Sequence, residues 1–263
     1  MVDSYLEFNG DPRHDKKVRE ELGLQQRPLR KALKVLFIIL FVSALLAGNT
    51  IIFHNLYFKS FFVNGQSMYP TLNLNATYKN GSLIGQFEGG SDDGKVVEYG
   101  IMDTHSSALN DIRRFDIIIT TYDEFEDDDK IKRVVALPGE TFYFISSDDT
   151  TNGDLYLIPN GESDGVLIPQ PIADQYKTGG SYSSSLTPSI TAPLTLADDE
   201  YFVLGDNRAR SDDSRGHGAI KFAWIKGRAI AIEGVCTLSC PPDQSGCRAT
   251  NIRLHWPRLL RGS

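Results

Sequence analysis

A long apolar run near the N-terminus constrains this chain more than any other feature. From Val35 to Phe53 the residues are apolar apart from a few small polar ones, namely Ser43, Gly48, Asn49 and Thr50. A helix needs about 20 such residues to cross a bilayer. We therefore expect one transmembrane helix at residues 35–53. A short segment, 1–34, precedes it, and the soluble part after it is large enough for one substantial core or two small ones.

Charge on either side of the apolar run predicts its orientation. The stretch Lys16–Lys34 carries seven Lys or Arg and two Glu, a net charge of +5, whereas the chain from Val35 onward has 19 basic and 28 acidic residues, a net charge of −9. Because basic residues stay on the cytoplasmic side of a membrane helix, we expect segment 1–34 inside and the rest outside. The total charge of −7 argues against a general nucleic-acid binder.

A cleavable secretory signal is the competing interpretation of the same run. The stretch Ala44-Leu-Leu-Ala47 contains small residues, and the preceding region is basic. However, the 34 residues ahead of the apolar run are long for the basic region of a signal peptide. The sequence therefore favours a retained signal anchor.

A hydroxyl that could act as a nucleophile follows shortly after this helix. Ser67 lies in Val63–Leu72, Val-Asn-Gly-Gln-Ser-Met-Tyr-Pro-Thr-Leu, next to a flexible glycine and a stiffening proline. A serine needs a base at neutral pH. Period-2 alternation puts Lys132 on the same strand face as Val134 and Ala136, where apolar neighbours would remove water from the ammonium and lower its pKa. The pattern indicates a Ser/Lys pair.

Four blocks in this order resemble the bacterial type I signal peptidases, a family of Ser/Lys proteases. They are Ser67-Met68-Tyr69-Pro70-Thr71, Asp116–Thr120, Lys132-Arg133 with Leu137-Pro138-Gly139, and Gly205-Asp-Asn-Arg-Ala-Arg-Ser-Asp-Asp-Ser-Arg215. The resemblance implies a mainly β fold in which an antiparallel-sheet catalytic core, 54–140 and 200–235, carries a β insertion domain, 141–199. We read residues 236–263 as a C-terminal tail. No metal or organic cofactor is implied.

The same resemblance implies roles for individual residues. Ser67 is the expected nucleophile and Lys132 its base, and the Ser67 backbone N–H is the expected oxyanion donor, because Gly65 stands where some relatives have a serine. Ser211 would orient the amine, Gly205 would keep space open beside the pair, and Asp213 and Arg215 would support the loop through an ion pair. The residues expected to line pockets for small substrate side chains are Phe62, Val63 and Met68.

The function implied is removal of signal peptides from exported preproteins at the bacterial plasma membrane, with the N-terminus cytoplasmic and the catalytic domain outside. The expected partners are preprotein signal peptides, membrane lipid and the export machinery. A specialised conjugation-linked or pilin-precursor peptidase and an inactive membrane-anchored binding protein remain alternatives. A Ser/His/Asp triad would have to use His54, His105 or His217, and the chain has no Gly-x-Ser-x-Gly elbow.

Three cysteines, Cys236, Cys240 and Cys247, lie near the C-terminus. A metal site would need a fourth ligand, for which His255 is the nearest candidate. We favour one local disulfide and one free thiol, which suits an extracytoplasmic location.

Overall fold

The computed structural model describes residues 28–84, 91–125, 128–145, 153–177, 187–242 and 246–260. The chain divides into two compact units, Met1–Leu56 and Tyr57–Ser263, and each is described by itself. The described part of the first unit belongs to helix α2 (Pro28–Tyr57). Within α2, Lys31–Thr50 forms a 20-residue stretch that is long and apolar enough to cross a membrane.

Polar side chains in α2 bond to the helix's own backbone. Ser43 Oγ donates to the Leu40 carbonyl at 2.9 Å, Asn49 Nδ2 to the Leu45 carbonyl at 3.0 Å, and Thr50 Oγ1 to the Leu46 carbonyl at 2.9 Å. Such bonds satisfy polar groups that have no water partner in an apolar environment. The small polar residues that interrupt the run are therefore compatible with a membrane span.

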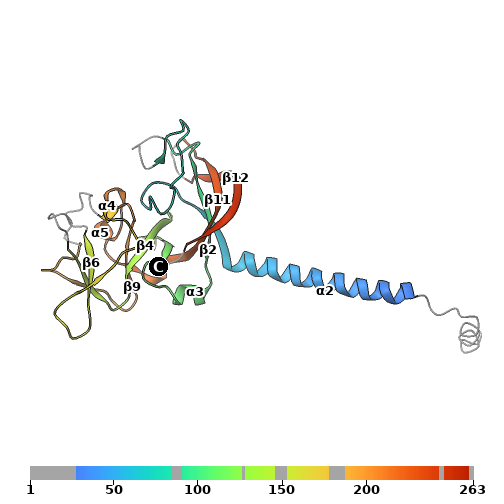
Figure 1. Cartoon of the computed structure of the whole chain (residues 1–263), viewed down its shortest axis with the longest axis horizontal. Coiled ribbons are helices and arrows are strands. Elements are labelled where there is room, and N and C mark those ends of the chain that lie inside the picture. The colour runs from blue at the N-terminus through green and yellow to red at the C-terminus, as the bar shows by residue number, and fades with distance from the viewer. Residues whose placement is uncertain are drawn as a thin grey trace, which may run out of the picture. The chain divides into compact units, whose positions relative to one another are not determined.

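The second unit is built on an eight-stranded antiparallel sheet (Figure 1). The strand order is β1-β2-β11-β3-β4-β9-β10, and β12 pairs with β11. Strand β11 has 15 residues, so it can pair with β2, β3 and β12 along its length. The strands are β1 (Phe58–Phe62), β2 (Val96–Asp103), β3 (Ile117–Thr120), β4 (Lys130–Ala136), β9 (Glu200–Leu204), β10 (Ile220–Lys221), β11 (Ile225–Ser239) and β12 (Arg248–Leu259).

A smaller antiparallel sheet lies between β4 and β9 in the sequence. Its order is β7-β6-β5-β8, formed by β5 (Thr141–Ile145), β6 (Asp154–Ile158), β7 (Val166–Ile168) and β8 (Leu194–Thr195). The remaining helices are short: α3 (Ser106–Asn110), α4 (Asp174–Lys177), α5 (Ser214–His217), η2 (Arg208–Arg210) and η3 (Phe222–Trp224). The expected fold class, a mainly β protein with one N-terminal apolar helix, is confirmed.

The two sheets share a hydrophobic cluster. Phe142 and Phe144 of β5 pack with Phe202 of β9, and the rings of Phe142 and Phe202 lie 5.0 Å apart between centroids. Alternate residues of a strand face the same side, so one face of each strand can contribute to this shared core. The smaller sheet is thus fixed to the larger one by apolar burial.

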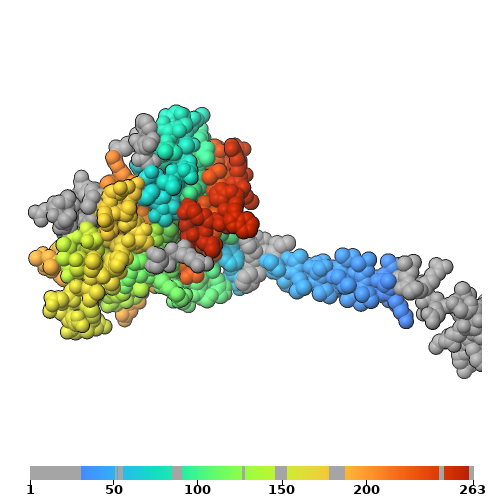
Figure 2. All heavy atoms as spheres, viewed as in Figure 1, coloured from blue at the N-terminus to red at the C-terminus, as the bar shows by residue number. Residues whose placement is uncertain are grey.

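The C-terminal region differs from the expected tail at 236–263. Strand β11 continues to Ser239, and β12 returns antiparallel to it, with Ile232 opposite Arg258 and Ser239 opposite Arg248. A disulfide joins Cys240 and Cys247 near the turn, and Cys236 is a buried free thiol. The prediction of one local disulfide and one free thiol is confirmed. Figure 2 shows this C-terminal segment, in red, on the surface of the unit.

Candidate active site

The segment that carries Ser67, the nucleophile loop (Val63–Leu72), follows β1 and is anchored by apolar side chains. Val63, Met68 and Leu72 are buried in one cluster with residues of the large sheet, whereas Ser67 is partly exposed. Two hydrogen-bonded turns shape the loop. Tyr69 N donates to the Gln66 carbonyl at 3.0 Å, and Leu72 N donates to the Met68 carbonyl at 2.9 Å. Burial of the neighbours therefore presents the Ser67 hydroxyl at the surface of the core.

Lys132 is held beside Ser67 by its place in β4. It lies opposite Ile118 of β3 and is 4% exposed. Its Nζ lies 3.2 Å from Ser67 Oγ and 3.1 Å from the Ile131 carbonyl. Burial lowers the pKa of Lys132 to about 8, an effect that the negative charge of Asp213 partly opposes. A sizeable fraction of the amine is consequently neutral near physiological pH.

Gly205 lies where no side chain fits. A Cβ added at Gly205 would lie 2.2 Å from Ser211 Oγ and 2.5 Å from the Ser67 carbonyl oxygen. Both distances are far below van der Waals contact, so the close approach of Gly205 to Ser67 and Ser211 requires glycine.

The Ser211 hydroxyl is buried and, within the described ranges, forms no hydrogen bond. It is therefore not bonded to Lys132, whose Nζ contacts Ser67 and the Ile131 carbonyl instead. A buried hydroxyl without a hydrogen-bond partner lowers the stability of the fold, which indicates a functional reason for keeping Ser211.

Two buried ion pairs hold the Gly205–Arg215 loop. The expected pair is present: Arg215 Nε donates to Asp213 Oδ1 at 2.7 Å and Nη2 to Oδ2 at 2.8 Å. The second pair was not predicted: Arg133 Nε donates to Asp206 Oδ1 at 2.7 Å and Nη2 to Oδ2 at 2.6 Å. The sequence signal for this pair was Arg133, directly after Lys132. Arg133 points to the opposite face of the strand, and a buried guanidinium needs a carboxylate partner.

Asn207 holds the backbone carbonyls on both sides of the Ser67 N–H. Asn207 N donates to the Ser67 carbonyl at 3.0 Å, and Asn207 Nδ2 donates to the Gln66 carbonyl at 3.3 Å. No acceptor among the described residues takes the Ser67 N–H. At Gly65, φ is +96°, a conformation that favours glycine over residues with a side chain.

The residues expected to line substrate pockets do not form one group. Val63 and Met68 are buried in the cluster below the nucleophile loop, whereas Phe62 is half-buried and packs against a different cluster that includes Val97 and Leu238. Alternation along the chain explains this, because Phe62 and Val63 point to opposite sides.

The histidines have other partners. His105 Nδ1 accepts from Ser107 N at 3.1 Å and caps α3. His217 Nε2 lies 2.9 Å from Asp212 Oδ2, and its ring stacks on Tyr122 with 4.1 Å between centroids. The side chain of His54 lies outside the described residues. In the described ranges, the side-chain partner of Ser67 Oγ is Lys132.

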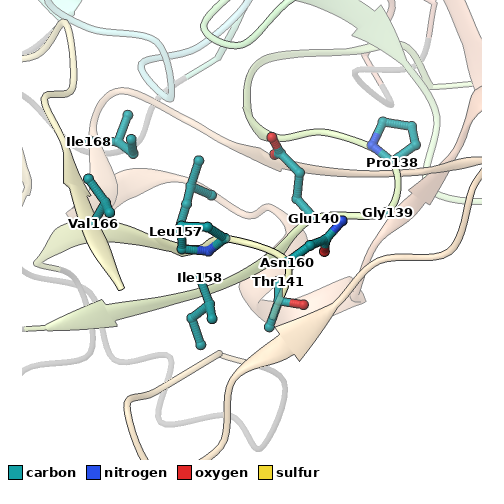
Figure 3. A pocket seen from close by; sticks show the side chains of 10 residues that line it. Pro138, Gly139, Glu140, Thr141, Leu157, Ile158, Asn160, Val166 and Ile168 are labelled. Atoms are coloured by element: carbon teal, nitrogen blue, oxygen red, sulfur yellow. The ribbon is translucent and has the colours of Figure 1, made fainter. Parts of the chain in front are cut away.

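A hollow of about 580 Å³ lies away from these residues (Figure 3). It is lined by the loop Pro138–Thr141, by Leu157 to Asn160, and by Val166 and Ile168 of β7. Neither Ser67 nor Lys132 lines it. We assign it no catalytic role.

Comparisons with known proteins identify the family. A family model described as "Signal peptidase, peptidase S26" matches residues 30–233. Signal peptidase I of Bacillus caldolyticus is 31% identical over 173 residues, which cover 65% of this chain and 76% of that protein. Signal peptidase I S of Bacillus subtilis is 29% identical over 171 residues, covering 63% and 70% respectively.

A crystal structure of a signal peptidase I from Enterococcus faecalis is also similar. It is 34% identical, with a TM-score of 0.32, and the match covers 44% of this chain and 95% of that one. The family match spans well over half of this chain and includes all four sequence blocks. This chain therefore belongs to the signal peptidase family, peptidase S26, and is a peptidase.

Proposed function

We propose that this chain is a membrane-anchored serine endopeptidase that uses Ser67 and Lys132 to cleave signal peptides from exported preproteins. One observation carries the proposal: Ser67 Oγ lies 3.2 Å from the buried Nζ of Lys132, whose pKa is lowered to about 8. This is the distance at which a neutral amine can take a proton from a hydroxyl.

The reaction follows from this pair. As Ser67 Oγ attacks the scissile carbonyl, the neutral Lys132 amine takes the hydroxyl proton, and the carbonyl oxygen becomes an oxyanion. The ammonium then gives its proton to the leaving amine as the C–N bond breaks, leaving an acyl group on Ser67. A water molecule, deprotonated by the same amine, releases the acyl group and restores the serine.

The oxyanion needs a donor, and the unused Ser67 N–H is the group we assign. Removing one such donor from a serine protease costs about 10² to 10³ in kcat. We assign Ser211 to orient the amine once substrate enters, since its buried hydroxyl is unsatisfied and a Cβ on Gly205 would touch it. Asp213 and Arg215 support this loop. Phe62, which is half-buried, remains our candidate for substrate contact, whereas Val63 and Met68 are each 1% exposed and pack beneath the nucleophile loop.

Helix α2 is the proposed anchor. It includes Lys31–Thr50, a candidate membrane span, and basic residues precede its apolar part, which favours a cytoplasmic N-terminus and a catalytic unit outside. We propose residues 35–53 as the anchor, 54–140 with 200–235 as the catalytic core and 141–199 as the insertion. Membrane lipid and the export machinery are the proposed partners besides the signal peptide.

Substitution of the base tests the mechanism. Lys132→Met in the full-length chain, purified in detergent and assayed on a preprotein, should lower kcat at least about 10²-fold, because a positioned base contributes about 10² to 10⁴. The melting temperature should not fall, since a buried ammonium is replaced by an apolar side chain of similar length. Lys226→Met is the matched control, because Lys226 is an exposed lysine of β11. Wild-type turnover by Lys132→Met would exclude the amine as the base.

A further inference from the structure

The nucleophile loop is held from a second side by residues that lie outside the four sequence blocks. Asn73, Glu98 and Arg258 form a continuous set of contacts that we call the loop brace. Asn73 directly follows the nucleophile loop, Glu98 lies on β2, and Arg258 lies on β12. Arg258 also lies beyond residues 30–233, the part of the chain that matches the family.

Asn73 binds two backbone carbonyls that lie shortly before Ser67 in the chain. Its Nδ2 donates to the Val63 carbonyl at 2.6 Å and to the Gly65 carbonyl at 2.9 Å. The side chain is 1% exposed, and the backbone has φ +61°, which asparagine tolerates better than most residues. Asn73 therefore sets the backbone path that leads to the Ser67 N–H.

Glu98 holds Asn73 through two hydrogen bonds. Asn73 N donates to Glu98 Oε2, and Glu98 N donates to Asn73 Oδ1, both at 2.8 Å. The Glu98 carbonyl also accepts from Val63 N at 3.0 Å. The amide nitrogen and the amide oxygen of the Asn73 side chain are thus both hydrogen-bonded, and these contacts fix the position of Asn73 relative to strand β2.

Arg258 completes the set from the C-terminal strand. Its Nη2 donates to Glu98 Oε1 at 2.8 Å, and its Nη1 donates to the Thr71 carbonyl of the nucleophile loop at 3.0 Å. In the described parts of the chain, it is the one cation that forms an ion pair with the buried Glu98 carboxylate. Figure 2 shows the red C-terminal segment beside the cyan atoms of the segment that includes Thr71.

We propose that Asn73 and Arg258 are positioning residues for the nucleophile, and that the C-terminal strand β12 acts on the reaction through them. Asn207 holds the Ser67 and Gln66 carbonyls from one side, and the loop brace holds Val63, Gly65 and Thr71 from the other. Among the described residues, the brace bonds to the loop backbone, whereas the Lys132 amine contacts Ser67 and the Ile131 carbonyl. It fixes the direction of the Ser67 hydroxyl and N–H, on which attack and oxyanion binding depend.

The proposal rests on the proposed function and predicts a defect in kcat rather than in KM. Arg258→Ala should lower kcat roughly tenfold, and Asn73→Ala roughly 100-fold, because small misplacements of reacting groups have effects of this size. KM should stay within about twofold, and the pH midpoint of the reaction should not move, because Lys132 is untouched. Arg258→Lys should recover part of the activity, because its ammonium can reach one of the two acceptors.

A double variant distinguishes two residues that act through shared contacts from two residues that act independently. Asn73→Ala combined with Arg258→Ala should lower kcat by less than the product of the two single losses, because the Arg258–Glu98 contact acts on the loop through Asn73, whereas the bond from Arg258 to the Thr71 carbonyl acts directly. The control is Arg253→Ala, an exposed arginine of the same strand, which should keep wild-type kcat. Rates are normalised to the folded fraction measured by circular dichroism at the assay temperature.

Wild-type kcat for Arg258→Ala, or losses that multiply in the double variant, would overturn the brace. Ser67→Ala, assayed in the same preparation, keeps this result apart from the proposed mechanism. If Ser67→Ala is inactive while Arg258→Ala is fully active, only the brace is wrong. If Ser67→Ala cleaves at the wild-type rate, the proposed function is wrong.

Discussion

Lys132 is the residue whose ionisation should set the pH dependence of cleavage. Its pKa is lowered to about 8, so the fraction of neutral amine rises with pH and reaches one half near that value. We expect kcat/KM to rise about tenfold per pH unit below the midpoint and to level off above it, as for any single essential base. A pH–rate profile of the full-length chain on a preprotein measures this limb.

The neighbouring charge of Lys130 provides a test of the assignment. Lys130 lowers the pKa of Lys132 through charge repulsion. Lys130→Met should therefore move the rising limb to higher pH while leaving the plateau unchanged. A flat profile in the wild type, or a limb that moves to lower pH in Lys130→Met, would contradict a neutral Lys132 base.

At the scale of residues, the sequence was informative where chemistry has a local pattern. Ser67 and Lys132 were singled out because each lies in a recognisable block and because alternation puts Lys132 on an apolar strand face, and the structure brings them within 3.2 Å of each other. Asn73, Glu98 and Arg258 were missed, since Glu98 and Arg258 are 160 positions apart and their contacts depend on how β2, β11 and β12 pair. No spacing along the chain signals such a contact.

At the scale of elements, the Gly205–Arg215 loop depends on the ion pair of Asp213 and Arg215. Asp213 also caps α5 and accepts from Gly205 N at 3.0 Å. Arg215→Ala should destabilise the folded chain by about 3 to 5 kcal/mol, because it leaves a buried carboxylate without its partner. Thermal unfolding in detergent measures the loss. Arg113→Ala, which removes an exposed pair with Asp111, should leave the melting temperature unchanged; equal losses in the two variants would contradict a special role for the buried pair.

Strands β5, β6 and β9 consist largely of aromatic and aliphatic residues, a composition that favours strands. The C-terminal strand β12 was interpreted as part of a tail: Pro257 disfavours a strand, although Ile252, Leu254 and Trp256 alternate with Arg253, His255 and Pro257. It is a strand because β11 continues to Ser239 and offers it backbone partners, with two irregularities in register. Pairing of this kind overrides local propensity.

At the scale of the whole molecule, the sequence distinguishes the apolar run from the rest of the chain. It does not predict that the two sheets pack into one core. Residues from both sides of the insertion, such as Phe142 and Phe202, meet in one cluster. A sequence shows that each of these side chains is apolar, but not that they share one core. Removing residues 141–199 would therefore expose part of the catalytic core, and the insertion is better described as a packed extension of the fold.

The exposed face of β12 gives the last prediction, which concerns contact between the catalytic unit and lipid. Trp256 is 92% exposed and Leu254 is 70% exposed, and both lie on β12 two residues apart. Residues two apart on a strand share a face, and exposed tryptophan and leucine on one face favour the membrane–water interface. In proteoliposomes of the Trp224→Phe variant, whose remaining tryptophan is Trp256, headgroup-level nitroxide lipids should quench the fluorescence. The reciprocal variant Trp256→Phe, which keeps the half-buried Trp224, should be quenched much less. Equal quenching of both, or none in Trp224→Phe, would show that this face of the molecule does not touch lipid.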